Sequence, residues 1–191
     1  QEVNGCALSD DEVFSMVELL ISGGVGTTAS LVGQSLVYLD EDLELRRRLV
    51  DHPELLQRAI EEFLRVFSPT QALARSVVKD DEIAGCTVRE GDRVLISWAS
   101  ANRDAAQFAD PDEVDITRWP NRHLAFGAGV HRCAGAHLAR LMAQVIVSSV
   151  LTRMPDYRVV RRDLAPYSSQ GVNAGWGKIP VTFTAGHRIR R

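Results

Sequence analysis

Hydrophobic residues recur at helical spacing along the first forty residues of the chain. Between Asp10 and Leu39 they lie three or four positions apart, which predicts one long helix with Ser9 or Asp10 as its N-cap. The pattern is interrupted at Gly23-Gly24-Val25-Gly26-Thr27-Thr28, where three glycines and two threonines are poor helix formers. We therefore expect the helix to distort there, and the alternative is two helices that meet at a Gly-rich turn.

The same spacing predicts three more helices, over residues 43–50, over residues 53–66, and from beside Cys133 to just before Pro155. The last of these is expected to bury a stripe formed by Leu138, Leu141, Met142, Val145, Ile146 and Val150. Short β runs at 76–78 and 94–96 alternate with polar turns at 79–81 and 89–92, and residues 157–183 resemble a hairpin. The predicted fold class is mainly α with small antiparallel β sheets, and residues 1–191 are expected to form a single unit.

Charge and composition narrow the class of protein. The 22 Lys and Arg residues against 25 Asp and Glu residues give a net charge of −3, which argues against a strongly basic nucleic-acid-binding protein. No apolar run is long enough for a membrane span, no secretory signal is visible, and the first residue is not Met. We expect a cytoplasmic protein, no membrane partner, and a chain that begins partway through a larger product.

The chain has three cysteines, and they are widely spaced. An odd number without a CxxC motif argues against a disulfide framework and favours a reducing compartment. We expect Cys6 and Cys86 to be small buried or half-buried residues. Cys133 lies in an unusual neighbourhood and is considered separately.

The segment from Phe126 to Gly135 is the best candidate for chemistry. Its glycines, Gly127, Gly129 and Gly135, permit positive φ and a close approach of the backbone to a flat group or a sulfur atom. Cys133 lies where a helix is expected to begin, and free N–H groups and the helix dipole there would stabilise a thiolate. A metal cluster or structural zinc needs further cysteines nearby, so a nucleophile or a ligand to a single iron remains. His131 and His137 flank Cys133 and keep the Cys/His nucleophile open, although the glycines have no role in it.

This segment resembles the haem-binding loop of the cytochrome P450 family, Phe-x-x-Gly-x-(His/Arg)-x-Cys-x-Gly. The matching residues are Phe126, Gly129, His131, Cys133 and Gly135. The resemblance implies haem b as the cofactor and Cys133 as the thiolate ligand of its iron, as in other P450 proteins. It also places Gly127 and Gly24 beside the haem, and it gives the propionates Arg75 and His131 as donors.

Other motifs of the family follow in the expected order. Glu62 and Arg65 resemble its Glu-x-x-Arg pair, and Arg118 is placed like the third member of that structural network. His123 is expected to make a structural hydrogen bond. Gly23, Gly24 and Thr27 resemble the oxygen-binding segment, which implies a catalytic role for Thr27 in managing protons. The sequence departs from the family at Gly26, where an acid is usual, and this removes one proton relay.

The resemblance implies the C-terminal, haem-ligating portion of a P450-like fold of the soluble bacterial type. It implies a monooxygenase acting on an apolar small molecule, with a ferredoxin-like electron donor docking at Arg122, Arg132 and Arg140. The residues expected to face substrate are Val25, Ala72, Leu73, Val172 and Asn173. Family members are about twice as long, so an absent N-terminal half would leave an apolar patch, which favours self-association or a partner. The alternatives are a non-catalytic haem-binding fragment and a haem-thiolate enzyme that uses peroxide or isomerises its substrate.

Overall fold

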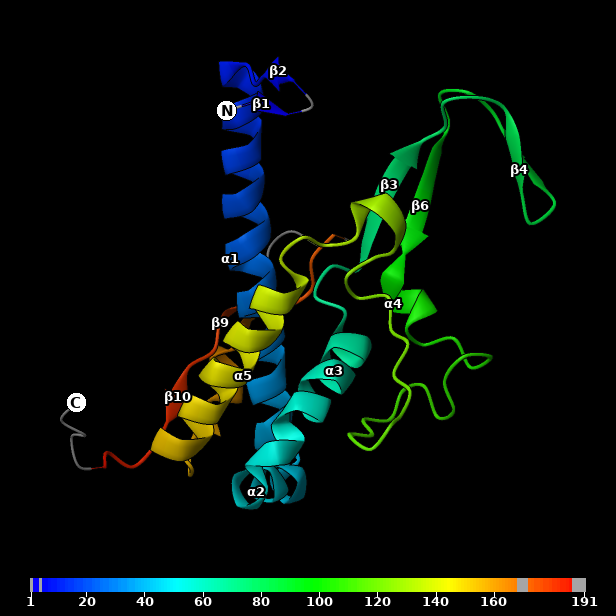
Figure 1. The fold of residues 1–191 in the computed structure, drawn as a ribbon. Helices are drawn as coiled ribbons and strands as arrows, with labels where there is room; N and C mark the ends of the chain where they lie inside the picture. The colour runs from blue at the N-terminus through cyan, green and yellow to red at the C-terminus, as the bar shows by residue number, and fades with distance from the viewer. Residues whose placement is uncertain (1, 4, 168–171, 187–191) are drawn as a thin grey trace.

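The protein is described by a computed structural model over residues 2–3, 5–167 and 172–186. In these ranges helices form the body of the molecule, and the strands pair into two-stranded antiparallel sheets (Figure 1). The predicted fold class, mainly α with small antiparallel sheets, is confirmed. The longest helix is α1, and three further helices gather around its C-terminal half.

Helix α1 covers Asp10–Glu41 without a break. Ser9 is its N-cap and forms a capping box with Glu12, so Asp10 is the first helical residue and not the cap. The Gly23–Thr28 segment lies inside the helix, and the alternative of two helices meeting at a turn is wrong. The Thr27 hydroxyl donates to the Gly23 carbonyl oxygen at 2.5 Å, which gives the side chain a partner within the helix.

Three helices pack against α1. They are α2 (Leu43–Asp51), α3 (Leu56–Phe67, after a 3-10 turn over Pro53–Leu55) and α5 (Ala136–Arg153), while α4 (Trp98–Ala101) is a single turn. Pro69 disfavours helical backbone at Ser68, which caps α3 at φ 40°, so α3 ends where the sequence predicts. The core contains Leu31, Leu39, Ile60, Phe63, Val147, Leu151 and Tyr157.

The face of α5 that packs against the core differs from the predicted one. Its buried residues are Ala136, Ala143, Val147 and Leu151. Of the predicted stripe only Val150 packs against the core, and the exposed members are Leu138, Leu141, Met142, Val145 and Ile146. Because α5 is apolar on two sides, periodicity alone selected the wrong side.

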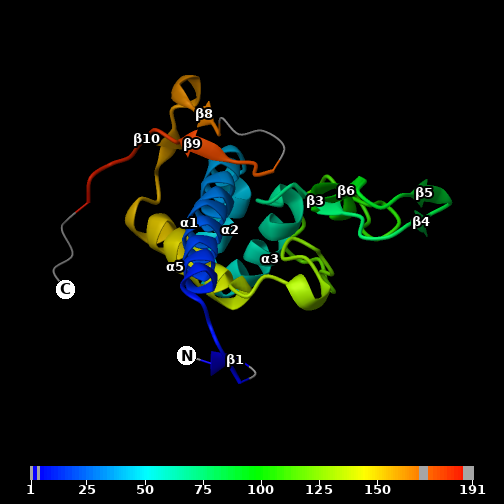
Figure 2. The same cartoon turned by 90° about the horizontal axis from the view of Figure 1, so that it is seen from above.

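The longest strands, β3 (Ala72–Ser76) and β6 (Arg93–Ser97), pair with Arg75 opposite Val94. The first β run therefore lies four residues before its predicted start. Beyond them β4 (Asp81–Ile83) and β5 (Cys86–Val88) form a hairpin that projects away from the helices (Figure 2). Cys86 and Cys6 are exposed, so their predicted burial is wrong.

The C-terminal segment and the N-terminus supply the remaining strands. In the tail, β7 (Arg158–Val159) pairs with β10 (Val181–Thr182), and β8 (Ala165–Pro166) pairs with β9 (Trp176–Lys178). Strands β9 and β10 do not pair with each other. The tail therefore folds back on itself through two nested pairs, β8–β9 inside β7–β10. Near the N-terminus β1 (Glu2–Val3) pairs with β2 (Cys6–Ala7). Single 3-10 turns lie at Gly129–His131 and Arg161–Asp163.

The N-terminal half of α1 carries large apolar side chains that are exposed in the described structure. Leu20 is 74% exposed and Val25 is 70% exposed, and the others are Val13, Phe14, Met16, Val17, Leu19 and Ile21. In length and apolar composition α1 meets the requirement for a membrane-crossing helix, contrary to the sequence-based expectation. Its C-terminal half, in contrast, is buried against α3 and α5, as a core helix of a globular domain is.

Candidate functional site

A buried ion-pair network joins α3 to the segment that follows α4. Arg65 donates from Nε and Nη2 to the two Glu62 carboxylate oxygens at 2.9 and 2.7 Å, and both side chains are fully buried. Arg118 donates from Nε to Glu62 at 3.2 Å, so the structure brings the three residues of the predicted network together. Although burial would raise the pKa of Glu62, hydrogen bonds from Arg65 hold it below its usual value.

Asn102 extends this network toward the candidate haem loop. Its backbone carbonyl accepts from Arg65 Nη1 at 2.9 Å, and its side-chain amide donates to the Ser68 hydroxyl at 2.8 Å. Its side-chain oxygen accepts from the Leu124 backbone N–H at 2.6 Å. One fully buried amide therefore ties the C-terminal cap of α3 to the start of the loop.

Residues 123–135, the Cys133 loop, approach α5 through a tight turn. Gly127 and Gly129 have φ of 68° and 71°, a region that a side chain rarely permits. Gly135 has φ −84° and serves as the N-cap of α5, so the positive φ that the sequence suggested there is absent. The Cys133 backbone N–H donates to the Phe126 carbonyl oxygen at 2.9 Å, which closes the loop, and Cys133 is exposed.

A second charged cluster, Glu61–His123–Arg140, lies beside this loop. Arg140 donates from Nε and Nη2 to the two Glu61 oxygens at 2.6 and 2.8 Å, and His123 Nε2 lies 3.1 Å from Glu61 Oε2. Burial alone would raise the pKa of Glu61, but the hydrogen bonds from Arg140 and His123 lower it to about 2. The expected structural hydrogen bond of His123 is thus present. Arg140 is engaged by Glu61 and its side chain is 23% exposed, and its place in a basic rim stays a prediction.

Sequence reasoning missed Glu61 because the Glu-x-x-Arg motif drew attention to its neighbour. Adjacent helical residues point about 100° apart, so Glu61 and Glu62 serve different partners. The only local signal was the doubled glutamate. The partners of Glu61 lie 62 and 79 residues further along the chain, and no spacing rule links residues so distant.

The Gly/Thr segment of α1 offers a bare helical surface. A Cβ atom added at Gly23, Gly24 or Gly26 would meet nothing within 4 Å in the described structure. Val25 projects into solvent, and Thr27 is half-buried. Because the Thr27 hydroxyl donates its proton to Gly23, its oxygen is left to accept a hydrogen bond from a water or a ligand.

The predicted propionate donors are exposed cations or potential cations. Arg75 lies on β3, where Nη1 donates to the Ala74 carbonyl oxygen at 3.0 Å, and His131 lies in the 3-10 turn before Cys133. Within the described residues, no hydrogen bond or ion pair joins Arg75, His131 and Cys133 to one another. Arg122 and Arg132 are exposed as well.

The structure brings two predicted substrate-facing segments together. The Gln71 backbone N–H donates to the Val172 carbonyl oxygen at 2.7 Å, and the Thr70 hydroxyl donates to Asn173 Oδ1 at 3.2 Å. Leu73 and Val172 are exposed, whereas Ala72 is only 6% exposed. Ala72 therefore faces the protein interior, and its contact with substrate stays a prediction.

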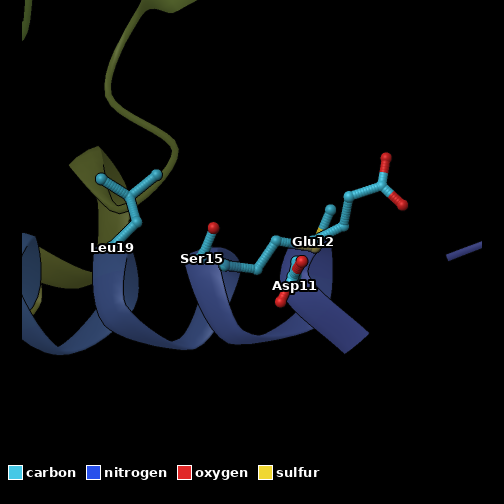
Figure 3. Close-up of a pocket in the computed structure, with 5 residues that line it drawn as sticks. Asp11, Glu12, Ser15 and Leu19 are labelled. Carbon is cyan, nitrogen blue, oxygen red and sulfur yellow. The ribbon is translucent and has the colours of Figure 1, made fainter. Parts of the chain in front are cut away.

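A shallow depression lies elsewhere, along the first turns of α1. Its lining residues are Asp11, Glu12, Ser15, Met16 and Leu19 (Figure 3). All of them belong to one helix, so the depression has a single wall. It contains none of the residues predicted for the site.

The donor set around Cys133 fits a haem. An exposed cysteine sulfur is available beside a loop made narrow by two glycines at positive φ. Among the residues that the structure describes, no three His, Cys, Asp or Glu side chains gather to hold a bare metal ion. The exposed Cys133 is thus a single soft ligand of the kind that holds a haem iron, and Arg75 and His131 stay predicted partners of the haem carboxylates.

Comparisons with known proteins agree with this arrangement. The sequence profile of the family described as Cytochrome P450 matches residues 1–154. The biotin biosynthesis cytochrome P450 of Bacillus subtilis is 40% identical over 176 residues, which are 92% of this chain and 44% of that protein. A steroid C26-monooxygenase of Mycobacterium tuberculosis is 37% identical over 184 residues, which are 96% of this chain and 50% of that protein.

Solved structures show the same similarity in three dimensions. The crystal structure of CYP109E1 from Bacillus megaterium in complex with testosterone superposes with a TM-score of 0.89 at 36% identity. The match covers 96% of this chain and 51% of that one. This chain therefore spans about half the length of the curated relatives and solved structures that it matches.

Proposed function

Because the chain belongs to the cytochrome P450 family, we propose that it is the haem-ligating portion of a monooxygenase. In this proposal residues 1–191 act as a single unit, and Cys133 supplies the thiolate that holds the iron of haem b. The observation that carries the proposal is an exposed Cys133 in a glycine-shaped loop, fastened at its own amide to Phe126. When bound, the haem supplies the redox-active iron that activates dioxygen for insertion of one oxygen atom into substrate.

The chain's own residues then divide the remaining tasks. Arg75 and His131 donate to the haem carboxylates, and Phe126, Gly127, Gly129 and Gly135 shape the loop on the thiolate side. Gly24 lets the helix approach the other side closely. Thr27 uses its free oxygen lone pairs to hold a water and guide protons, since its own proton is donated to Gly23.

Substrate and electron donor follow from the surfaces that surround these residues. The exposed side chains of Val25, Leu73 and Val172, with Asn173 beside them, favour an apolar small molecule. The steroid named for the Mycobacterium tuberculosis relative and the testosterone named for the Bacillus megaterium structure belong to that chemical class. We assign docking of a ferredoxin-like donor to Arg122, Arg132 and Arg140, in a cytoplasmic protein.

A second candidate function is supported by Gly26. The main chain at Gly26 accepts a hydrogen bond from the Tyr167 hydroxyl at 3.5 Å, but the residue brings no carboxylate to the segment. A haem-thiolate enzyme that uses peroxide or isomerises its substrate does not need a carboxylate that relays protons. A non-catalytic haem-binding fragment does not need one either. In a protein that unites this chain with the rest of the family fold, Thr27→Ala distinguishes the cases. A monooxygenase should lose dioxygen-supported turnover in Thr27→Ala, whereas an enzyme of the alternative class should show no dioxygen-supported turnover already in the wild type.

The first test is the absorption spectrum of the haem-treated, dithionite-reduced protein under carbon monoxide. We expect a thiolate-type, red-shifted Soret band in the wild type and loss of that band in Cys133→Ala. Cys86→Ala is a matched control, because Cys86 is also exposed but lies on the β4–β5 hairpin. A wild-type chain that takes up no haem would refute the assignment of Cys133 as a ligand in this chain.

A further inference from the structure

Glu61 joins three parts of the protein that meet at the Cys133 loop. It lies on α3, it accepts two hydrogen bonds from Arg140 on α5, and it accepts one from His123 at the start of the loop. The His123 side chain is only 4% exposed, so this contact is shielded from water. The Glu61 carboxylate therefore binds two N–H groups of the charged Arg140 and the shielded His123 ring, which restricts the position of all three side chains.

The hydrogen-bond pattern assigns the proton on His123. Its Nδ1 accepts the backbone N–H of Ala125 at 3.2 Å, so Nδ1 carries no proton. Nε2 must then be the protonated nitrogen, and it donates to Glu61. In this tautomer the Glu61 carboxylate orients the His123 imidazole, and the imidazole in turn holds the backbone N–H of Ala125.

A second path runs from Glu61 to the loop through Arg140. The Arg140 guanidinium donates hydrogen bonds to both Glu61 oxygens. It also lies over the Phe126 ring, with its central carbon 4.5 Å from the ring centroid. Phe126 is the residue whose carbonyl oxygen accepts the Cys133 backbone N–H. Both paths therefore end at the segment that holds the Cys133 amide.

We propose that Glu61 is a positioning residue for the cysteine ligand, acting through His123 and Arg140 on the backbone of the Cys133 loop. The inference rests on the proposed function for its purpose, since a fixed loop matters most if Cys133 holds iron. Glu61 touches no reacting atom. Its role is to hold the loop in one geometry before any ligand arrives, so that the thiolate meets the iron without rearrangement.

The loop has an independent attachment, which makes the proposal testable without loss of the fold. The Asn102 side-chain oxygen accepts a hydrogen bond from the Leu124 N–H, and Asn102 makes no hydrogen bond to Glu61 in the described structure. A Glu61→Gln variant therefore keeps a tethered loop while losing the charge that Arg140 and His123 share. Glu44→Gln is the matched control, because Glu44 is an exposed glutamate on α2.

The experiment is amide hydrogen exchange on the haem-free protein, read residue by residue. In Glu61→Gln we expect the Ala125 and Cys133 amides to exchange about tenfold faster or more, as loss of a charge-assisted hydrogen bond allows. The Ser68 and Met154 amides, which close the ends of α3 and α5, should keep their wild-type rates. Unchanged Ala125 and Cys133 rates would overturn the proposal. Equal acceleration at all four amides would also overturn it, since that is general destabilisation.

Two further measurements test the two steps of the proposal separately. His123→Asn keeps an acceptor for the Ala125 N–H, but its shorter side chain cannot reach Glu61. In this variant, faster exchange of the Cys133 amide supports the path through His123. A wild-type exchange rate at the Cys133 amide contradicts that path. With haem, Glu61→Gln should show a smaller fraction of the thiolate-type Soret band than Glu44→Gln. If the wild type shows no such band, the proposed function fails while the exchange result still decides the role of Glu61.

Discussion

Glu62 shows how one buried carboxylate can organise several segments. It accepts hydrogen bonds from Arg65, Arg118, the Asn121 amide and the Asp115 backbone N–H. Burial of a charge is costly, and here that cost is offset only because every partner is in place. The network is therefore a scaffold that depends on Glu62, because loss of this carboxylate leaves the buried Arg65 without its counter-charge.

We expect Glu62→Gln to lower the free energy of unfolding by about 3–5 kcal/mol, because Arg65 is then buried without its counter-charge. Urea unfolding followed by circular dichroism measures the change. Glu54→Gln, at a glutamate whose side chain is 70% exposed, should stay within about 0.5 kcal/mol of wild type. A loss below about 1 kcal/mol for Glu62→Gln would show that the network is not a main support of the fold.

Residues related by local spacing could be predicted, and residues joined by packing could not. Glu62 and Arg65 stand three apart on one helix, and Cys133 stands out by its glycines. The Glu61–Arg140 pair depends on how α3 meets α5, which no interval in the sequence encodes. Asn102 was missed for the same reason, since nothing near it shows that its amide reaches both Ser68 and Leu124.

For the helices, the residues at which they begin and end were more predictable from the sequence than the side that each one buries. Ser9 and the Ser68–Pro69 pair mark where α1 begins and α3 ends, because capping and proline act on the local backbone. The buried side of α5 was assigned wrongly, since Leu138 and Val147 are equally apolar and only the neighbours select between them. The strands of the β4–β5 hairpin are three residues each, which is too short for an alternating pattern to mark them.

Helix α1 should respond to loss of its cap locally and not globally. Its first turns are exposed and support no core residue, so Ser9→Ala should fray them without shifting the main unfolding transition. We expect amide exchange over residues 12–16 to rise several-fold while the midpoint temperature stays within about 1 °C. A clear drop in the midpoint would mean that the start of α1 is packed in solution.

The whole molecule is asymmetric, with a buried end and an apolar open end. The C-terminal half of α1 lies in the core, whereas the apolar side chains of its N-terminal half and of the outer face of α5 are exposed. Soluble monomers seldom expose so many large apolar side chains on adjoining elements. We therefore predict that a protein partner or a second copy of the chain covers these surfaces.

Sedimentation velocity of the isolated chain should show self-association that rises with concentration. Leu20→Lys should shift the distribution toward monomer, because it places a charge in the exposed apolar surface of α1. Val78→Lys is the control, since Val78 is 82% exposed but lies between β3 and β4. A concentration-independent monomer for the wild type would contradict the expectation.

The anchors of the Cys133 loop also set an order of events during folding. Glu61 lies 62 residues before His123 and 79 residues before Arg140, so each contact closes a long stretch of chain. The entropy lost in such closures is recovered only once the two helices have docked. We therefore expect the Cys133 loop to gain its final shape late in folding, after α3 and α5 have docked behind it.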